Sequence, residues 1–107
     1  MELLLTTQDR FADYEITETL GLVRGNTVRA RHAGKDIMAG LRNMVGGEIE
    51  EYTKLLAESR EQATDRMREE ARTLGADGIV CVRFTTSSIM GGAAELFAYG
   101  TAVKLTK

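Results

Sequence analysis

The sequence contains no proline and no tryptophan, and it has one cysteine and one histidine in 107 residues. A lone cysteine cannot close a disulfide within the chain, so a reducing compartment, by default the cytoplasm, is expected. The apolar runs are a few residues long, far short of the roughly 20 that a membrane-spanning helix needs. The start of the chain, Met1–Leu5, lacks the basic region and the apolar length of a signal peptide.

The chain also has fewer positively than negatively charged residues. Lys and Arg number 14 against 16 Asp and Glu, which gives a net charge of −2 with no basic run. Binding to nucleic acid requires clustered positive charge that neutralises phosphates. We therefore expect neither a nucleic-acid partner nor a membrane partner. The length and the ordinary apolar share of 43% predict one globular domain spanning residues 1–107.

Some segments of the chain have the residue pattern of strands and others have the apolar spacing of helices. Four stretches rich in β-branched and aromatic residues are predicted as strands: residues 3–7, 14–31, 79–85 and 95–106. Gly21 and Gly25 interrupt the second stretch, which predicts a bulge or bend. Apolar residues spaced by one, three and four predict a short helix over residues 35–45.

The clearest helical pattern runs from about Glu48 to Leu74. Its apolar residues recur every three or four positions, as on one face of a helix: Ile49, Tyr52, Leu56, Ala63, Met67, Ala71 and Leu74. Gly75 is placed to end this helix in a left-handed conformation. Ser87–Gly92 is predicted to be a flexible loop between the last two strands, either a ligand-binding loop or a plain hairpin turn.

The last two strands predict a sheet that is apolar on both faces. Strict alternation puts Val80, Val82 and Phe84 on one face and Ile79, Cys81 and Arg83 on the other. In the final strand it separates Leu96, Ala98, Gly100 and Ala102 from Phe97, Tyr99, Thr101, Val103 and Leu105. One long helix covers one face, so we expect copies of the same chain to cover the rest. The alternative is a monomer in which the short helix and the N-terminal strand suffice.

Four blocks of the sequence resemble a known family. They are Ala39–Gly47 (Ala-Gly-Leu-Arg-Asn-Met-Val-Gly-Gly), Tyr52, Leu74–Val80 (Leu-Gly-Ala-Asp-Gly-Ile-Val) and Gly100–Lys104 (Gly-Thr-Ala-Val-Lys). In this order they resemble the YbjQ-like family of small bacterial proteins, from about Leu3 to Lys104. The resemblance implies an α+β, dodecin-like β-α-β-β subunit: an antiparallel sheet with one long helix packed on one face. It also implies a homo-oligomeric ring of five copies.

Members of that family are labelled as heavy-metal-binding, yet this chain has few metal ligands. Soft metals take three or four thiolate, thioether or imidazole ligands, whereas one chain offers Cys81, His32 and five methionines. A ring would solve this by bringing one ligand from each subunit to a shared axis. Cys81 and His32 are therefore the candidate metal ligands, with a metal ion as the candidate cofactor. Alternatively, Cys81 is a small apolar residue at an interface and His32 a solvated loop residue.

Catalytic motifs are missing, and the family offers no catalytic residues to carry over. His32 is the sole histidine, so a Cys81–His32 pair would require the fold or a neighbouring subunit to join the two residues. No glycine-rich phosphate-binding motif follows a strand. The leading hypothesis is a protein that binds a metal or small ligand at subunit junctions. A purely structural assembly module and an enzyme with a composite site between subunits are the alternatives.

Overall fold

The structure is a computed structural model that describes residues 2–29, 49–89 and 93–107. Its elements follow in the order β1 (Leu4–Leu5), β2 (Glu15–Arg29), α2 (Ile49–Thr73), β3 (Gly78–Ile89) and β4 (Ala93–Thr106). The predicted α+β class and the order of one long helix followed by two strands are confirmed. The short helix predicted over residues 35–45 lies outside the described residues.

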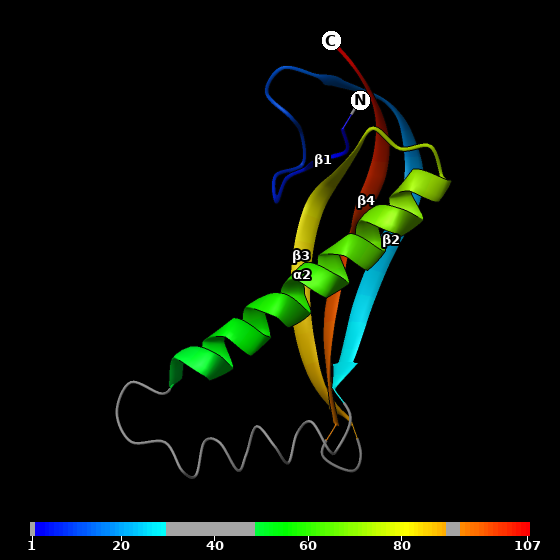
Figure 1. Cartoon of the computed structure of the whole chain (residues 1–107). Helices are drawn as coiled ribbons and strands as arrows, with labels where there is room; N and C mark the ends of the chain where they lie inside the picture. The colour runs from blue at the N-terminus through cyan, green and yellow to red at the C-terminus, as the bar shows by residue number, and fades with distance from the viewer. Residues whose placement is uncertain (1, 30–48, 90–92) are drawn as a thin grey trace.

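The strands form one four-stranded sheet in the order β1-β3-β4-β2, shown in Figure 1. β4 pairs antiparallel with both β3 and β2, whereas β1 pairs parallel with β3 through Leu4 opposite Gly78 and Leu5 opposite Ile79. The expectation of a wholly antiparallel sheet is therefore wrong at this edge. The residue pattern of a two-residue strand holds no information about its direction, which is set by the neighbour it meets.

Helix α2 crosses one face of the sheet and packs against β2 and β4, as Figure 1 shows. Ala63, Met67 and Ala71, spaced by one helical turn, are fully buried against the sheet. Their partners in this core are Val23, Ile79, Val82, Ala98 and Ala102. The Thr27 hydroxyl ties β2 to the helix by donating to the Ser59 carbonyl oxygen at 3.1 Å. The middle of the predicted helical stripe forms this layer, whereas Leu56 and Leu74 of the same stripe are each 45% exposed.

The end of α2 follows the sequence prediction closely. Gly75 has a φ of +76°, and its N–H donates to the Arg72 carbonyl oxygen at 3.0 Å. The Ala76 N–H donates to the Ala71 carbonyl oxygen at 3.1 Å. These two bonds form a Schellman motif, in which a glycine takes the left-handed position without the strain of a Cβ atom.

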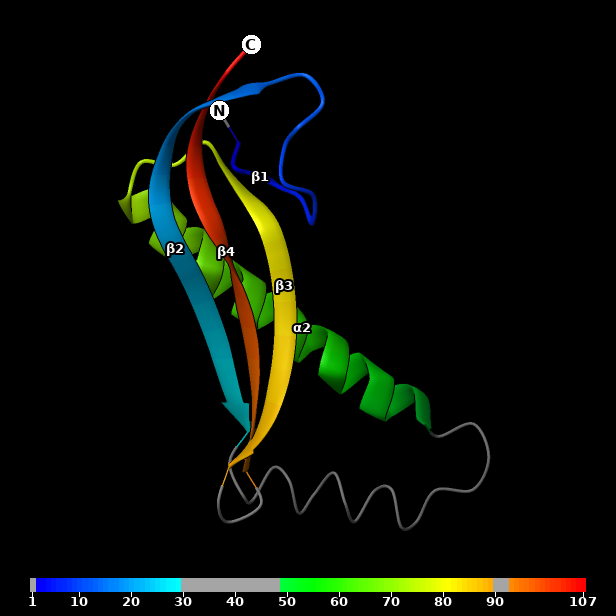
Figure 2. The same ribbon diagram turned by 180° about the vertical axis from the view of Figure 1, so that it is seen from behind.

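The second face of the sheet is seen from behind in Figure 2. Near the chain termini it carries a smaller core of Val80, Val103 and Leu105, against which Leu4, Phe11 and Tyr14 of the N-terminal segment pack. Further along the same face, Leu22 is 61% exposed and Val28 is 50% exposed. The sheet is therefore apolar on both faces, and the N-terminal segment covers one part of the second face.

Candidate functional site

Cys81, the candidate ligand that the structure describes, lies in a bulge that divides β3. The pairing of β3 with β4 shifts register at this point, and Cys81 has a φ of +57°. A left-handed conformation costs roughly 1–2 kcal/mol for a residue with a Cβ atom. The N-terminal segment holds it in place: the Cys81 N–H donates to the Gln8 carbonyl oxygen at 2.8 Å, and the Val82 N–H to that of Thr6 at 3.0 Å.

The bulge makes the predicted alternation along β3 wrong. Val82 joins Ile79 in the core beneath α2, whereas Val80 lies in the core on the opposite face. Cys81, expected on the face away from Val80, packs against the same cluster as Val80. An extra residue in one strand shifts every later side chain to the other face. The sequence gives no warning of it, because a cysteine rather than a glycine takes the left-handed position.

The surroundings of Cys81 are apolar and half-open. The residue is partly buried beside Val80, Val103 and Leu105. Within the described ranges, no three His, Cys, Asp or Glu side chains gather in a group that could hold a metal ion. His32 lies outside the described residues, so the pairing of Cys81 with His32 stays a prediction. The described part of one chain thus brings a single soft ligand to this position.

The charged groups of β3 and its approach are engaged with the backbone. The Asp77 carboxylate accepts the Leu105 N–H at 3.0 Å and so joins the start of β3 to the end of β4. The Arg83 guanidinium donates to the carbonyl oxygens of Thr7 at 2.7 Å and Val82 at 2.9 Å. The Arg83 contact thus holds the N-terminal segment against the sheet, and the Asp77 contact joins two strands of the sheet.

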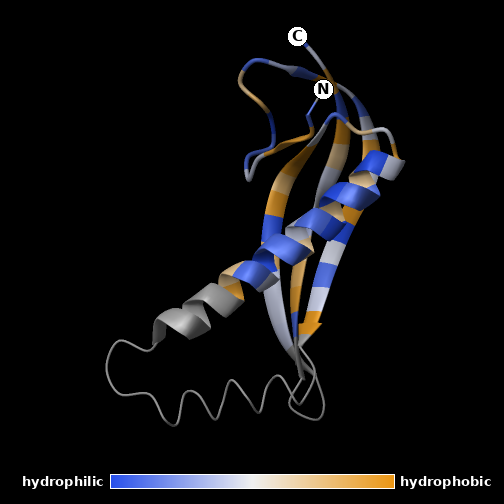
Figure 3. Cartoon of the chain, in the orientation of Figure 1, coloured by the Kyte–Doolittle hydropathy of each residue, from blue (hydrophilic) through white to orange (hydrophobic). Residues whose placement is uncertain are grey.

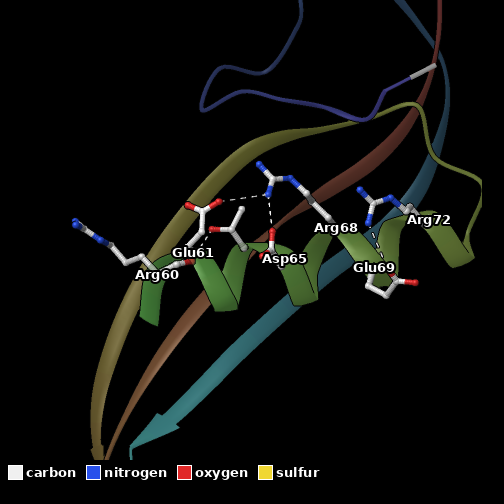
Figure 4. A network of polar contacts seen from close by, with 7 residues as sticks. Arg60, Glu61, Asp65, Arg68, Glu69 and Arg72 are labelled. Carbon is white, nitrogen blue, oxygen red and sulfur yellow. Dashed lines mark hydrogen bonds and ion pairs between the residues drawn. The ribbon is translucent and has the colours of Figure 1, made fainter. Parts of the chain in front are cut away.

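The outer side of α2 is hydrophilic, as Figure 3 shows, and its charges pair with one another. Figure 4 shows Arg68 between Asp65 at 2.7 Å and Glu61 at 3.7 Å, with Arg72 beside Glu69 at 3.2 Å. Exposed ion pairs of this kind contribute roughly 0–1 kcal/mol each. From Glu58 to Arg72, where the side chains of this face are described, acids and bases are interspersed, so this part of α2 offers no patch of one sign to a charged ligand.

The first half of the segment predicted as a loop between the last two strands, Ser87–Ile89, is strand. β3 continues to Ile89 and β4 begins at Ala93. Ser87, Ser88 and Ile89 therefore extend the hairpin, and that part of the prediction is wrong. Residues 90–92 lie outside the described part of the chain. A run of Thr and Ser is compatible with a strand when the neighbouring strand supplies the ladder, which a local pattern does not reveal.

An aromatic pair stands on the uncovered part of the second face. The rings of Phe97 and Tyr99 lie 5.6 Å apart between centroids. Asn26 and Arg24 of β2 stand opposite them, and the Asn26 amide donates to the Glu95 carboxylate at 2.9 Å. This surface suits a protein interface, because aromatic residues with a few hydrogen-bonding neighbours are typical of interface cores.

None of the helices in the described ranges has the length and apolar character to cross a membrane.

A family model described as "Putative heavy-metal-binding" matches residues 3–106. The chain is 61% identical over 104 residues to a UPF0145 protein of Archaeoglobus fulgidus, covering 97% of this chain and 96% of that one. It is 57% identical over 103 residues to a UPF0145 protein of Methanosarcina acetivorans, covering 96% and 97% of the two chains. A Thermus thermophilus relative, UPF0145 protein TTHA1944, is 53% identical over 105 residues, covering 98% and 92%.

Among solved structures, a DUF74-family protein from Pediococcus pentosaceus is similar with a TM-score of 0.62. The identity is 18%, with 97% of this chain and 98% of that chain covered, so the likeness concerns the fold. Relatives occur in archaea as well as bacteria, which corrects the expectation of a purely bacterial family. The chain therefore belongs to the YbjQ-like family, whose model covers nearly its whole length.

Proposed function

We propose that this protein assembles with copies of itself and binds a metal ion or another small ligand at the junctions between the copies. The apolar residues that one chain leaves exposed carry this proposal. On the second face, Leu22 and Val28 of β2 flank the positions opposite Tyr99 and Phe97. Phe84, which pairs with Ala98 of the core beneath α2, is 47% exposed on the helix side. Larger exposed apolar surfaces mark interaction sites, and another copy of the chain is the commonest partner.

The junction is the natural place for a ligand because a single chain offers too few donors. The described residues of one chain hold no group of three His, Cys, Asp or Glu side chains, and the whole sequence has one cysteine and one histidine, which favours a soft-metal site that takes ligands from several copies. Symmetry repeats Cys81 and His32 in every copy, and both remain the candidate ligands. The family's description supports a metal, and the family resemblance suggests a ring of five. A reduced thiol in this role fits a cytoplasmic location.

Calorimetric titration of the purified, reduced protein with Zn²⁺ and Cu⁺ tests this function. The wild type is expected to bind one of these ions and to melt at a higher temperature when loaded, because a ligand that binds the folded state stabilises it. Cys81→Ser and His32→Ala should each weaken binding at least tenfold. Sedimentation of the two variants is the control, and it should show that they still assemble as the wild type does. If wild-type protein in its assembled form binds neither ion, the metal part of the proposal is wrong.

A structural assembly module is the second candidate. The observation in its favour is that the charged groups around β3, Asp77 and Arg83, are already engaged with the backbone. This candidate predicts a stable particle whose melting temperature no metal ion raises. An enzyme would instead need at least two titratable groups meeting across a junction, and a structure of the assembly would reveal them.

A further inference from the structure

Two arginines flank Tyr99 on the second face of the sheet. Arg24 of β2 and Arg83 of β3 are both cross-strand partners of Tyr99 in β4, the middle one of these three strands in Figure 2. Residues directly opposite one another in neighbouring strands share a face. Ala98 belongs to the core beneath α2, so its chain neighbour Tyr99 and the two arginines lie on the other face. The bulge at Cys81 brings Arg83 to this face.

The two arginines are placed to reach one ligand above Tyr99. Arg24 and Arg83 are exposed, and Tyr99 between them is half-buried. The strands that carry the arginines are two strand spacings apart, about 10 Å, which lies within the combined reach of two arginine side chains. Arg83 donates through Nη1 to the carbonyl oxygens of Thr7 and Val82, and its Nε and Nη2 atoms take no part in these bonds.

The positive charge of this pair has no counter-charge among the described residues. The ion pairs found there all lie on α2, and neither Arg24 nor Arg83 belongs to one. One acid of β2, β3 and β4, Glu95, shares this face, and its carboxylate accepts a hydrogen bond from the Asn26 amide. Two unpaired like charges at this separation create a positive potential between them, which attracts an anion.

We propose that Arg24, Tyr99 and Arg83 form a binding site for the phosphate group of a small molecule. Charge selects this ligand class, because a phosphate group carries close to two negative charges at neutral pH and so balances two guanidinium groups. The planar fork of a guanidinium also matches phosphate oxygens. The Tyr99 hydroxyl supplies a further donor. Phe97, whose ring centroid lies 5.6 Å from that of Tyr99, offers apolar surface to the rest of the molecule.

The site uses residues of one chain, so it goes beyond the self-association and the metal site proposed above and depends on neither. Calorimetric titration of the full chain with inorganic phosphate tests it, in low-salt buffer with a chelator so that no metal ion mediates binding. The wild type is expected to bind phosphate at millimolar concentration or below. High salt should weaken this binding, because it screens exposed charges.

Arg24→Gln is the decisive variant, because Arg24 is exposed and belongs to no ion pair among the described residues. It should fold normally and lose at least tenfold in phosphate affinity. Arg83→Gln should lose affinity as well, and Tyr99→Phe should lose less. Arg60→Gln, the same change of charge at an exposed arginine of α2, is the matched control and should bind as the wild type does. Circular dichroism verifies that each variant is folded.

The outcomes separate this site from the function proposed above. If the wild type does not bind phosphate at millimolar concentration, or if Arg24→Gln binds it as tightly as Arg60→Gln, the site is wrong. Tighter binding of malonate, a dicarboxylate of similar charge, would overturn the choice of phosphate. Sedimentation in the same buffer reports on assembly alone: a single chain of 11.8 kDa that binds phosphate would contradict self-association and support this site.

Discussion

Gly25 lies where β2 touches α2, and its missing side chain permits the contact. A Cβ atom there would stand 2.2 Å from the Ala63 carbonyl oxygen and 2.4 Å from the Met67 nitrogen. Both are backbone atoms of the helix and cannot swing aside. The glycine expected to cause a bend is thus a site of close packing, whereas Gly21, with a φ of +127°, takes part in the irregularity of β2.

Gly25→Ala should therefore force the helix away from the sheet and lower the free energy of unfolding by about 3 kcal/mol, at the upper end of overpacking costs. Gly75→Ala is the matched control. Its Cβ would meet nothing closer than the Lys104 ammonium at 3.8 Å, so it pays for the left-handed backbone alone, roughly 1–2 kcal/mol. Urea unfolding measures the unfolding free energy of both variants. An equal loss of unfolding free energy in the two would contradict close packing at Gly25.

The bulge at Cys81 makes a second prediction at this scale. Cys81→Gly should change the unfolding free energy by less than about 1 kcal/mol, because relief of the left-handed backbone offsets the lost packing of a half-buried thiol. Cys81→Val should cost more than about 2 kcal/mol, since a β-branched residue is poorly tolerated at positive φ. Chemical denaturation compares the pair. A valine variant as stable as the glycine variant would show that the residue is not left-handed.

Helix α2 is held to the sheet by a short row of buried side chains. Met67 fills the centre of that row and is fully buried, while Leu74 on the predicted stripe is 45% exposed. Met67→Ala should lower the unfolding free energy by about 2–5 kcal/mol, the range for a large buried side chain cut to alanine. Leu74→Ala should cost less than about 1 kcal/mol. Thermal and urea unfolding measure both variants. Similar losses of unfolding free energy in Met67→Ala and Leu74→Ala would contradict the central place of Met67 in this row.

The helices and strands differ in how well their bounds, faces and direction could be predicted from the sequence. The long helix was predicted over 48–74 and found over Ile49–Thr73, because a seven-turn apolar period and a terminal glycine are local signals. Alternation along β4 placed Ala98 and Val103 on opposite faces, as observed, because this strand is uninterrupted between them. Alternation along β3 failed at Cys81. The parallel direction of β1 was equally hidden, since it arises from contacts distant in sequence.

The candidate site was predicted less completely than the fold. Cys81 could be named from residue chemistry, because thiolates bind soft metals wherever they stand. Its neighbours, Gln8 and Leu105 among them, come from segments far away in the sequence, and the bulge that positions it has no local signal. The role of Cys81 as a ligand remains a prediction for the metal titration.

The whole molecule leaves apolar side chains open on both sides of one sheet. Leu22 is the most exposed of them. Leu22→Asp should weaken self-association at least tenfold, because a carboxylate would have to be desolvated at the interface. The exposed position predicts little change in the far-ultraviolet circular dichroism spectrum. Glu18→Asp, an exposed acid on the same strand, is the control that should associate normally. Association of Leu22→Asp at wild-type strength would exclude this part of the face from the junction.

Sedimentation equilibrium of the wild-type protein over a dilution series tests the central claim most directly. The account predicts a particle whose mass is two or more times the 11.8 kDa of one chain and which persists at micromolar concentration, because other copies cover Leu22, Val28 and Phe84. A single species of 11.8 kDa throughout the series would contradict it, since the exposed apolar residues would then be stable in water without a partner.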